Sequence, residues 1–357
     1  MILKDVNMVL VGDTFVGRPD PDAVFEPVKH LIQGADIAFC NLETVVADSN
    51  HIDQYDRDHR PRMDESSIAA YMRAGFNFMN QANNPNTYHG LHALVRSLEV
   101  LEAMNVAHGG AGRNLAEARK PAIIERNGTK VAFVCRTSVG TPEMAATVDT
   151  PGVARYPVHT LYEAPSRVHS NPGLLPIVHT VPDRGAHREQ LTEDIRKARD
   201  AADVVIVSWH WGLSPFQVYP GAGAGEVEVM EYQKEMGRYA IDCGADMVVG
   251  HHPHEPQPIE IYKGKPILYS LANFVHDLES FKHRRLMALL VRCLIRDGKI
   301  QRLGFVPGVL NGNGPPVFTR PAESPEVVER IIQMSTPFGT RFEVGEEDVT
   351  VVLSSIR

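Results

Sequence analysis

The chain has 357 residues, 43% of them hydrophobic and 22% charged, and a formal net charge of -8. This composition is that of an ordinary folded protein and excludes collagen-like chains, disulfide scaffolds and largely disordered chains. Because the charge is negative and Lys and Arg form no cluster, we expect no nucleic-acid partner, whose phosphates need clustered basic side chains.

No segment predicts membrane insertion or export. No apolar run approaches the roughly 20 residues that span a bilayer. The first residues, Met1 to Asp5, lead into a strand-like segment without the apolar stretch of a signal peptide. We therefore expect a cytoplasmic protein with no membrane anchor.

The first half alternates strand-like and helix-like segments. The predicted strands are Met8 to Val11, Ile37 to Cys40 and Phe76 to Met79, and the predicted helices are Ala23 to Ile32 and Leu91 to Met104. Polar residues follow directly where the apolar strands end. This alternation is typical of a layered α/β domain with its functional loops at one edge of a sheet, and we expect a single domain over residues 1–357.

Two dipeptides predict β-hairpins and hence antiparallel pairing. Asn127-Gly128 joins the runs Ala122 to Glu125 and Val131 to Val134, and Asp297-Gly298 joins two later runs, Leu286 to Ile295 and Ile300 to Phe305. A purely parallel sheet is therefore disfavoured. The pattern favours mixed sheets in a two-sheet sandwich flanked by helices.

Periodicity disappears between Thr137 and His187, which we interpret as an insertion over the active site. It contains His159, His169, His179, His187, Arg155, Arg167, Arg184 and Arg188. The arginines could bind a substrate carboxylate, although for any one of them a solvated polar loop is the favoured interpretation.

Periodic patterns resume with helices over Leu191 to Ala202 and Met230 to Cys243 and strands over Val204 to Ser208 and Met247 to Val249. The charged stretch from Asp53 to Arg62 predicts a second surface loop.

The four cysteines predict reduced thiols in the core. They are Cys40, Cys135, Cys243 and Cys293, all scattered within apolar segments. Cys135 ends a predicted strand, so a nucleophilic role is the alternative there.

Five short segments place metal-competent side chains directly after apolar strands. They are Gly12-Asp13, Asn41-Leu42-Glu43, Asn83-Asn84, His210-Trp211-Gly212 and Gly250-His251-His252-Pro253-His254. Imidazole and oxygen donors suit zinc, manganese, iron, magnesium or calcium, and no thiolate accompanies them. Residues two apart on an extended backbone project to one side, so we expect His252 and His254 to converge, with Pro253 keeping the chain extended.

These segments, in this order, resemble the CapA family of poly-γ-glutamate capsule synthesis proteins, which have a calcineurin-like metallophosphatase fold. The resemblance covers most of Asn7 to Asp277 and includes Gly109 to Ala118, Gly244-Ala245-Asp246 and Tyr269 to Phe274. It implies a four-layer αββα sandwich with metal ligands on loops at one end of the sheets.

The resemblance also implies a ligand set. Asp13 and His254 would bind one metal position, Glu43 would sit between two positions, and the second position would take Asn84, His210 and His252. The metallophosphatase pattern has a His two residues after the first Asp, where this chain has Phe15. One or two divalent ions per chain are therefore expected.

The chain also departs from the family around the catalytic histidine. Family members commonly read Ala-Asn-Asn-His followed by Asp, whereas Pro85 and Tyr88 stand at those positions here. Since that His would donate a proton to a leaving group, we expect weak phosphomonoesterase activity. His89 is the candidate replacement, with a solvent-facing residue at a helix start as the alternative.

Three functions are consistent with this pattern. The first is a metal-dependent hydrolase that cuts an amide or related carbonyl bond of a carboxylated small molecule or peptide by means of metal-activated water, with His89, His210 and His254 as the catalytic candidates. The second is a metal-dependent peptide epimerase that inverts an α-carbon. The third is a non-enzymatic factor in capsule assembly or export.

Overall fold

The computed structural model describes residues 5–48, 50, 62–214 and 228–353. The predicted loop from Asp53 to Arg62 lies outside these residues except for Arg62. No helix within the described part of the chain is long and apolar enough to cross a membrane.

The larger sheet has ten strands and mixed pairing. Its order is β19 (Phe342–Val344), β20 (Val349–Val351), β17 (Lys299–Asn311), β16 (Arg285–Arg296), β1 (Val6–Phe15), β2 (Ile37–Leu42), β3 (Phe78–Asn80) and β4 (Ala107–Gly109), with β15 (Asn273–His276) paired to β1 and β18 (Val317–Phe318) paired to β17. The strands from β1 to β4 run parallel, whereas β16 is antiparallel to both β1 and β17. The carboxyl ends of β1, β2 and β3 therefore meet at one edge of the sheet.

The second sheet has six strands and is also mixed. Its order is β13 (Ile259–Tyr262), β14 (Lys265–Leu268), β12 (Met247–His251), β11 (Val204–His210), β7 (Thr129–Thr137) and β6 (Ala122–Arg126). Strands β7, β11, β12 and β14 are parallel, and β6 and β13 are antiparallel to their neighbours. The expectation of a mixed α/β class with several sheets is confirmed.

An apolar core joins the two sheets. Phe39 of β2 stacks on Phe133 of β7 with ring centroids 5.5 Å apart, and Phe78 of β3 stacks on the same ring at 4.0 Å. All three rings are fully buried, and burial of such a side chain contributes roughly 1.5–3 kcal/mol. This core fixes the two sheets against each other and brings their loop edges together.

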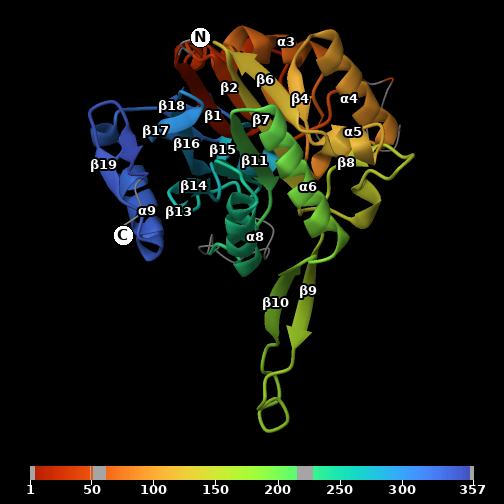
Figure 1. Cartoon of the computed structure of the whole chain (residues 1–357). Helices are drawn as coiled ribbons and strands as arrows, with labels where there is room; N and C mark the ends of the chain where they lie inside the picture. Colours follow the sequence, from red (N-terminus) through yellow and green to blue (C-terminus); the bar gives the residue numbers. More distant parts are fainter. Residues whose placement is uncertain (1–4, 49, 51–61, 215–227, 354–357) are drawn as a thin grey trace.

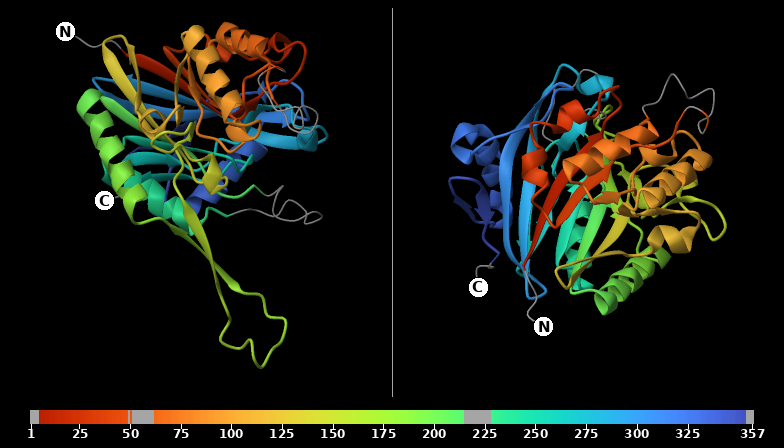
Figure 2. Two further views of the ribbon diagram at one scale, coloured as in Figure 1. Left: turned by 90° about the vertical axis from the view of Figure 1, so that its right-hand side faces the viewer. Right: turned by 90° about the horizontal axis from the view of Figure 1, so that it is seen from above.

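Helices contact the outer faces of the sheets. The larger sheet packs against α1 (Asp22–Phe25), α2 (Lys29–Ile32), α3 (Glu65–Ala74) and α4 (Leu91–Ala103), and the smaller sheet packs against α6 (Ala186–Ala201) and α8 (Glu231–Asp242). Figures 1 and 2 show these helices on the two sides of the paired sheets. Within the described residues, the other α-helices are α5 (Leu115–Arg119) and α9 (Pro325–Ser335).

Both predicted hairpins are present. Asn127 and Gly128 have φ values of 55° and 83°, and Asp297 and Gly298 have φ values of 51° and 67°. Two consecutive left-handed residues match the twist of the flanking strands, which is why Asn-Gly and Asp-Gly are favoured there.

The single helix predicted from Ala23 to Ile32 is wrong. The segment forms two short helices, α1 and α2, with Pro27 between them. Proline lacks the N–H that a continuous helix would use. Helix α3 was not predicted, although it starts after Asp64 and ends at Gly75, whose φ of 110° suits glycine.

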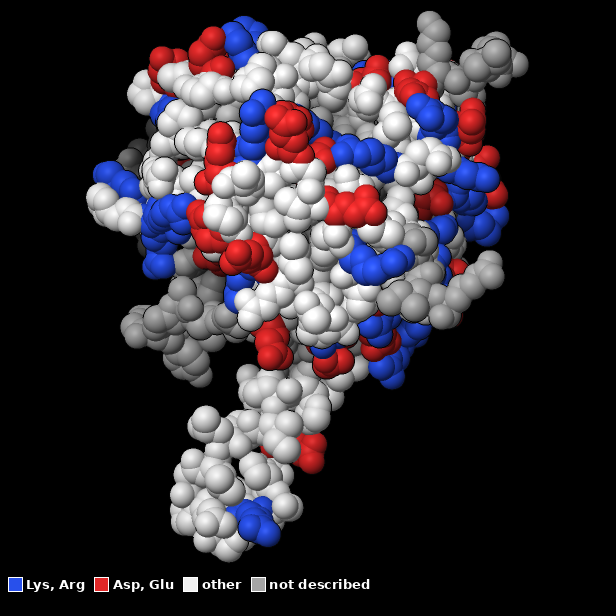
Figure 3. All heavy atoms as spheres, turned by 90° about the vertical axis from the view of Figure 1, so that its left-hand side faces the viewer, with Lys and Arg blue, Asp and Glu red and all other residues white. Residues whose placement is uncertain are grey.

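The segment from Thr137 to His187 contains regular structure that its lack of periodicity did not predict. Strand β8 (Gly152–Val153) pairs with β5 (Ala111–Gly112), and β9 (Val158–Glu163) pairs with β10 (Ile177–Pro182). The hairpin from Val158 to Pro182, which we call the arm, projects away from the body of the molecule (Figures 1 and 2). On the face shown in Figure 3 the arm carries few charged side chains, whereas acidic and basic groups alternate over the body.

Candidate metal centre

The loop edges of the two sheets bring buried polar side chains into one cluster, which we call the Glu43 cluster. The larger sheet contributes Asp13 on β1, Glu43 after β2, Asn84 after β3 and His276 at the end of β15, and the smaller sheet contributes His210 at the end of β11 with His252 and His254 after β12. All seven side chains are buried. The six residues predicted as metal ligands therefore lie in one region, with His276 as an additional member.

Glu43 lies between two pairs of histidines. Its Oε1 is 3.6 Å from His210 Nε2, and its Oε2 is 3.5 Å from His276 Nε2 and 3.8 Å from His254 Nδ1. Among the described residues, two groups place one ligand atom from each member within 4.8 Å of one another: Glu43 with His210 and His252, and Glu43 with His254 and His276. Both groups could hold a metal ion, and they share the Glu43 carboxylate.

Asp13 lies beside these two groups rather than within either of them. Its Oδ2 is 3.4 Å from His254 Nδ1 and accepts a hydrogen bond from the backbone N–H of His252 at 3.1 Å, and its Oδ1 accepts one from Asn41 Nδ2 at 2.7 Å. These bonds hold the carboxylate against the loop after β12. A ligand role for Asp13 stays a prediction.

Tyr88 orients the amide of Asn84. The Asn84 Nδ2 donates to the Tyr88 hydroxyl at 2.6 Å, and the Asn84 Oδ1 lies 2.8 Å from His210 Nε2. Since the amide nitrogen is bound to Tyr88, the oxygen faces the cluster, which is the atom that a metal requires. The departure from the family at Tyr88 therefore supports the site.

His252 and His254 converge, but the predicted extended backbone is wrong. Strand β12 ends at His251, and His252 and His254 have φ values of 96° and 60°. Their rings nevertheless approach to 5.7 Å between centroids. Positive φ at non-glycine residues costs free energy and is typical of functional sites, where the surroundings enforce it.

Burial determines the charge of most imidazoles in the cluster. It lowers the pKa of His210 well below its usual value and, together with the charge of His254, lowers the pKa of both His252 and His276 to about 3. Burial also raises the pKa of Glu43. These histidines are neutral at pH 7, the form in which imidazole binds metals.

His254 is the exception. Burial lowers its pKa, but the carboxylates of Glu43 and Asp13 outweigh that effect and raise the pKa to about 9. For Asp13, burial opposes ionisation, while the hydrogen bond and charge of His254 lower the pKa overall. A positive charge at this position is therefore electrostatically favoured, whether it is a proton or a metal ion.

Several buried atoms of the cluster lack hydrogen-bond partners within the described part of the chain. They are Glu43 Oε2, His252 Nδ1 and both ring nitrogens of His276. Unpaired buried polar atoms are costly, and a cation can satisfy both a carboxylate and neutral imidazoles. This donor set therefore fits a divalent ion.

Sequence reasoning missed two histidines at the cluster, His276 and His251. His276 lies two residues beyond the Tyr269 to Phe274 motif, so that motif was the available signal. His251 was part of a predicted segment without an assigned role. It is buried with its Nδ1 3.6 Å from Asp13 Oδ1, and its ring stacks on Phe39.

Two alternatives from the sequence can be decided. His89 is fully buried behind the 3-10 turn Pro85–Thr87, so its interpretation as a solvent-facing residue is wrong. Its role in proton transfer stays a prediction.

Cys135 lies in the core between the sheets, where burial raises its pKa to about 12. It is therefore not a thiolate at neutral pH, and all four cysteines are free thiols.

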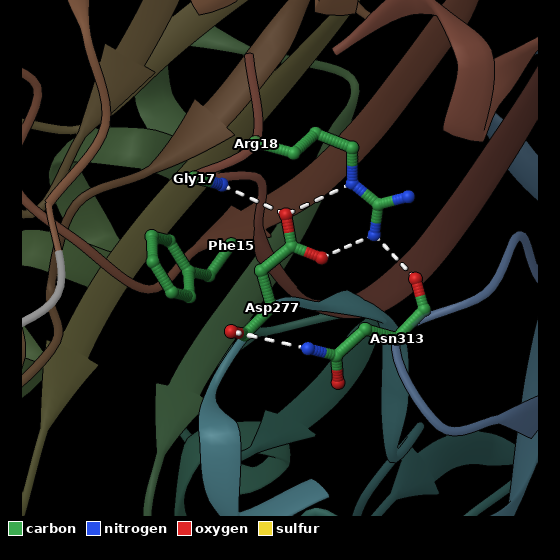
Figure 4. Close-up of a pocket in the computed structure, with 5 residues that line it drawn as sticks. All are labelled: Phe15, Gly17, Arg18, Asp277 and Asn313. Atoms are coloured by element: carbon green, nitrogen blue, oxygen red, sulfur yellow. Dashed lines mark hydrogen bonds and ion pairs between the residues drawn. The ribbon is translucent and has the colours of Figure 1, made fainter. Parts of the chain in front are cut away.

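A pocket opens beside the Glu43 cluster. Its volume is about 340 Å³, and it is lined by Phe15, Gly17, Arg18, Asp277 and Asn313. Asp277 accepts hydrogen bonds from the Gly17 N–H and from the Arg18 guanidinium, which also donates to the Asn313 carbonyl (Figure 4). This network ties the loop after β1 to the residue that follows His276.

The predicted insertion contacts the cluster only through its first part. The Ser138 N–H donates to the His210 carbonyl at 2.8 Å, and a Cβ built on Gly140 would lie 3.4 Å from that of Asn84. The half-buried Arg155 donates through Nε to the Gly140 carbonyl at 3.3 Å. The later arginines differ, because Arg184 and Arg188 both pair with Glu235.

Comparisons with known proteins agree on one family. The sequence profile described as "Bacterial capsule synthesis protein PGA_cap" matches residues 7–278. The chain is 29% identical over 276 residues to the "PGA biosynthesis protein CapA" of Bacillus subtilis strain 168, covering 75% of this chain and 62% of that protein. It is 27% identical over 329 residues to the "Capsule biosynthesis protein CapA" of Bacillus anthracis, covering 88% and 70%. The chain thus spans less than two thirds of the length of the Bacillus subtilis relative.

Two further matches have less specific descriptions. A "Probable polyglutamine synthesis accessory protein" of Mycobacterium tuberculosis is 31% identical over 252 residues, covering 68% of this chain and 56% of that protein. A solved structure of a hypothetical protein from Thermus thermophilus aligns with a TM-score of 0.49 and 14% identity, covering 86% of this chain and 99% of the other.

Proposed function

The chain belongs to the bacterial capsule synthesis protein family PGA_cap, and on that basis we propose that it is a metal-dependent hydrolase of an amide or related carbonyl bond. The observation that carries the proposal is the buried Glu43 carboxylate shared by two pairs of histidines. The names of the Bacillus relatives refer to PGA or capsule biosynthesis. We therefore include in the proposal a carboxylated small molecule or peptide of the glutamyl class as substrate, and the four-layer αββα sandwich of the metallophosphatases as the fold.

The residues proposed to hold the ion are Asp13, Glu43, Asn84, His210, His252 and His254. A divalent ion bound there would polarise a substrate carbonyl and lower the pKa of a water molecule. Imidazole and carboxylate donors favour zinc, manganese or iron over calcium and magnesium, which take oxygen ligands.

The surrounding side chains keep these donors in place. Tyr88 holds the Asn84 amide with its oxygen toward His210, and Asn41 holds Asp13. Such fixed donors need no reorganisation during a reaction, which is the main advantage of a preorganised polar site. We propose that proton movement falls to the histidines of the sequence prediction, His89, His210 and His254.

Two arginines are candidates for binding the substrate carboxylate. Arg155 lies beside the Gly140 loop that faces Asn84, and burial lowers its pKa while the nearby Glu143 opposes this effect. Arg18 lines the pocket on the side of His276, although Asp277 already neutralises its charge. Arg155 therefore has the greater need for an added carboxylate, and we assign that contact to it.

Ordinary phosphomonoester hydrolysis is not favoured. Pro85 stands where family members commonly have the proton-donating histidine, and it forms the first residue of a 3-10 turn. Removal of such a donor lowers rates by roughly two to four orders of magnitude. Weak turnover of an aryl phosphate is expected even with added manganese or zinc.

The experiment is a substrate assay in deuterated water with the protein loaded with manganese or zinc. γ-Glutamyl peptides and poly-γ-glutamate are incubated and examined by mass spectrometry and by chiral amino-acid analysis. Cleavage into two products whose masses together exceed that of the substrate by one water molecule supports the hydrolase. Inversion of an α-carbon with deuterium uptake and no cleavage would contradict it in favour of the epimerase, and polymer binding without either reaction would favour the non-enzymatic role.

A further inference from the structure

We propose that His276 is a metal ligand that completes a second position with Glu43 and His254, so that the chain binds two divalent ions bridged by Glu43. The proposal rests on the metal centre of the proposed function and specifies its nuclearity. The ligand class is a zinc, manganese or iron ion, because this position offers two imidazoles and one carboxylate.

The geometry of His276 is that of a member of the cluster rather than of a core residue. Its Nε2 lies 3.5 Å from Glu43 Oε2, and its ring lies edge-on to that of His254 at 5.3 Å. The ligand atoms of Glu43, His254 and His276 all lie within 4.8 Å of one another. A single ion at their centre would therefore be within reach of all three side chains.

Neither ring nitrogen of His276 has a hydrogen-bond partner among the described residues, although only 5% of the side chain is exposed. Glu43 Oε2, the carboxylate oxygen that faces it, is also without a partner there. A structural histidine in a core is normally bonded through at least one nitrogen. The shared lack of partners on facing atoms indicates that a cation binds between them.

The sheet explains how a histidine on β15 reaches this position. Strand β15 runs parallel to β1, and His276 is opposite Phe15, the residue that stands where the metallophosphatase pattern has a histidine. The two rings are in edge contact at 5.6 Å. The imidazole missing from β1 is therefore supplied by the neighbouring strand.

The local backbone is adapted to this strand pairing. A Cβ at Gly12 would lie 1.9 Å from the Ala272 carbonyl oxygen, so only glycine allows the chain before β15 to approach β1 so closely. The Asp13 N–H donates to that same oxygen at 2.8 Å. On the other side, Asp277 is fixed by the Gly17 N–H and by Arg18 (Figure 4). Both ends of β15 are thus held, and His276 with them.

The test is the metal stoichiometry of the purified full chain. Metal-free protein is titrated with Mn²⁺ and with Zn²⁺ by calorimetry, and elemental analysis follows gel filtration. We expect two equivalents in the natural protein and one in both His276→Gln and His276→Phe. The phenylalanine variant is matched to the aromatic surroundings of Phe15 and Phe281, so it guards against a folding defect, which circular dichroism checks.

Two controls separate this inference from the proposed function. His252→Gln should retain one equivalent, because it removes a ligand of the other position, and His108→Gln, at a half-buried histidine on β4, should retain two. Manganese EPR should show a spin-coupled pair in the natural protein and a six-line spectrum in His276→Gln. Two equivalents with a coupled spectrum in the His276 variants would overturn the inference. A single equivalent in the natural protein would also overturn it. A natural protein that binds no metal would contradict the proposed function as well.

Discussion

Two buried polar clusters of the molecule satisfy their charges in opposite ways. Between β7 and α6, Asp194 accepts two hydrogen bonds of 2.9 Å from Arg119 and one from Arg136. The Nη1 of Arg136 donates to the Cys135 carbonyl. In the Glu43 cluster, by contrast, one carboxylate oxygen and several imidazole nitrogens have no partner within the described residues. The Glu43 cluster is almost inaccessible to solvent, as are Asp194 and Arg136, whereas Arg119 is partly exposed.

The contrast separates structural from functional polar residues. The Asp194 network is complete within the chain, so its expected role is to attach α6 to the smaller sheet. The Glu43 cluster is incomplete within the chain, so it needs a ligand from outside. A protein retains such unfavourable buried groups where function requires them and compensates for them elsewhere. The predictions below test whether this division of roles holds.

The largest expected effect is on activity, from changes within the Glu43 cluster. Glu43→Gln should lose both ions and His252→Ala one of them. Both variants should lower kcat about a thousandfold, on the order of 4 kcal/mol, because transition-state stabilisation by the metal is lost. The thermal stability of the metal-free protein should stay the same or rise, since Glu43→Gln removes a buried charge and His252→Ala removes an unpaired imidazole nitrogen. Elemental analysis, kinetics and calorimetry measure these effects. Full metal occupancy in both variants would show that the ligand set is wrong.

The next largest effect is on stability and is expected from a change within the Asp194 network. Asp194→Ala leaves Arg136 buried without its partner and should lower the free energy of unfolding by about 3–5 kcal/mol. Glu193→Ala is the matched control, because the exposed Glu193 pairs with Arg119 and its loss should cost less than about 1 kcal/mol. Urea denaturation measures both, and the metal-to-protein ratio should be unchanged. A metal loss in Asp194→Ala at temperatures where it is folded would refute the separation of the two clusters.

A smaller effect is expected at Arg155, which is outside both clusters and donates to the Gly140 carbonyl near Asn84. Arg155→Ala should raise KM for a carboxylated substrate about tenfold, since a hydrogen bond to a charged group contributes roughly 1.5–3 kcal/mol, and should leave kcat nearly unchanged. Arg167→Ala, on the exposed part of the arm, is the control and should have normal kinetics. Steady-state kinetics with a γ-glutamyl peptide and its amidated analogue make the comparison. An equal KM for the variant and the natural protein would place the carboxylate contact elsewhere, with Arg18 as the next candidate.

The smallest effect is expected from the arm. Replacing residues 158–182 by a short Gly-Ser linker should leave metal content unchanged and alter the free energy of unfolding by less than about 1 kcal/mol, because exposed loops are tolerant of length changes. The insertion from Thr137 to His187 was predicted to select the substrate, and only its first part contacts the cluster. We therefore expect kcat/KM for small substrates to be retained. A large loss of kcat/KM would show that the arm itself contributes to substrate binding.

Local features of the sequence were sufficient to predict the family, the mixed α/β class, both hairpins and the strands β1, β2, β3, β6, β7, β11, β12, β16 and β17. Turn residues such as Asn127-Gly128 and the periodicity of apolar residues act over a few neighbouring positions, so they can be read directly along the chain. Polar residues at the ends of apolar strands predicted the cluster for the same reason. Pro27 is a local signal for the end of a helix, but the apolar periodicity from Ala23 to Ile32 predicts one continuous helix. The prediction of that helix was wrong for this reason.

Only the tertiary structure could identify His276 as a partner of Glu43 and Tyr88 as the residue that orients Asn84. Nothing in the local pattern around β15 indicates that it pairs with β1, which lies at the opposite end of the matched region of the chain. The same holds for the left-handed backbone at His252 and His254, which packing imposes against the local preference of these residues. The sequence alone therefore determined which kinds of ligand are present, and the pairing of distant strands decided which of them meet, because contacts between remote segments depend on how the sheets and their core assemble.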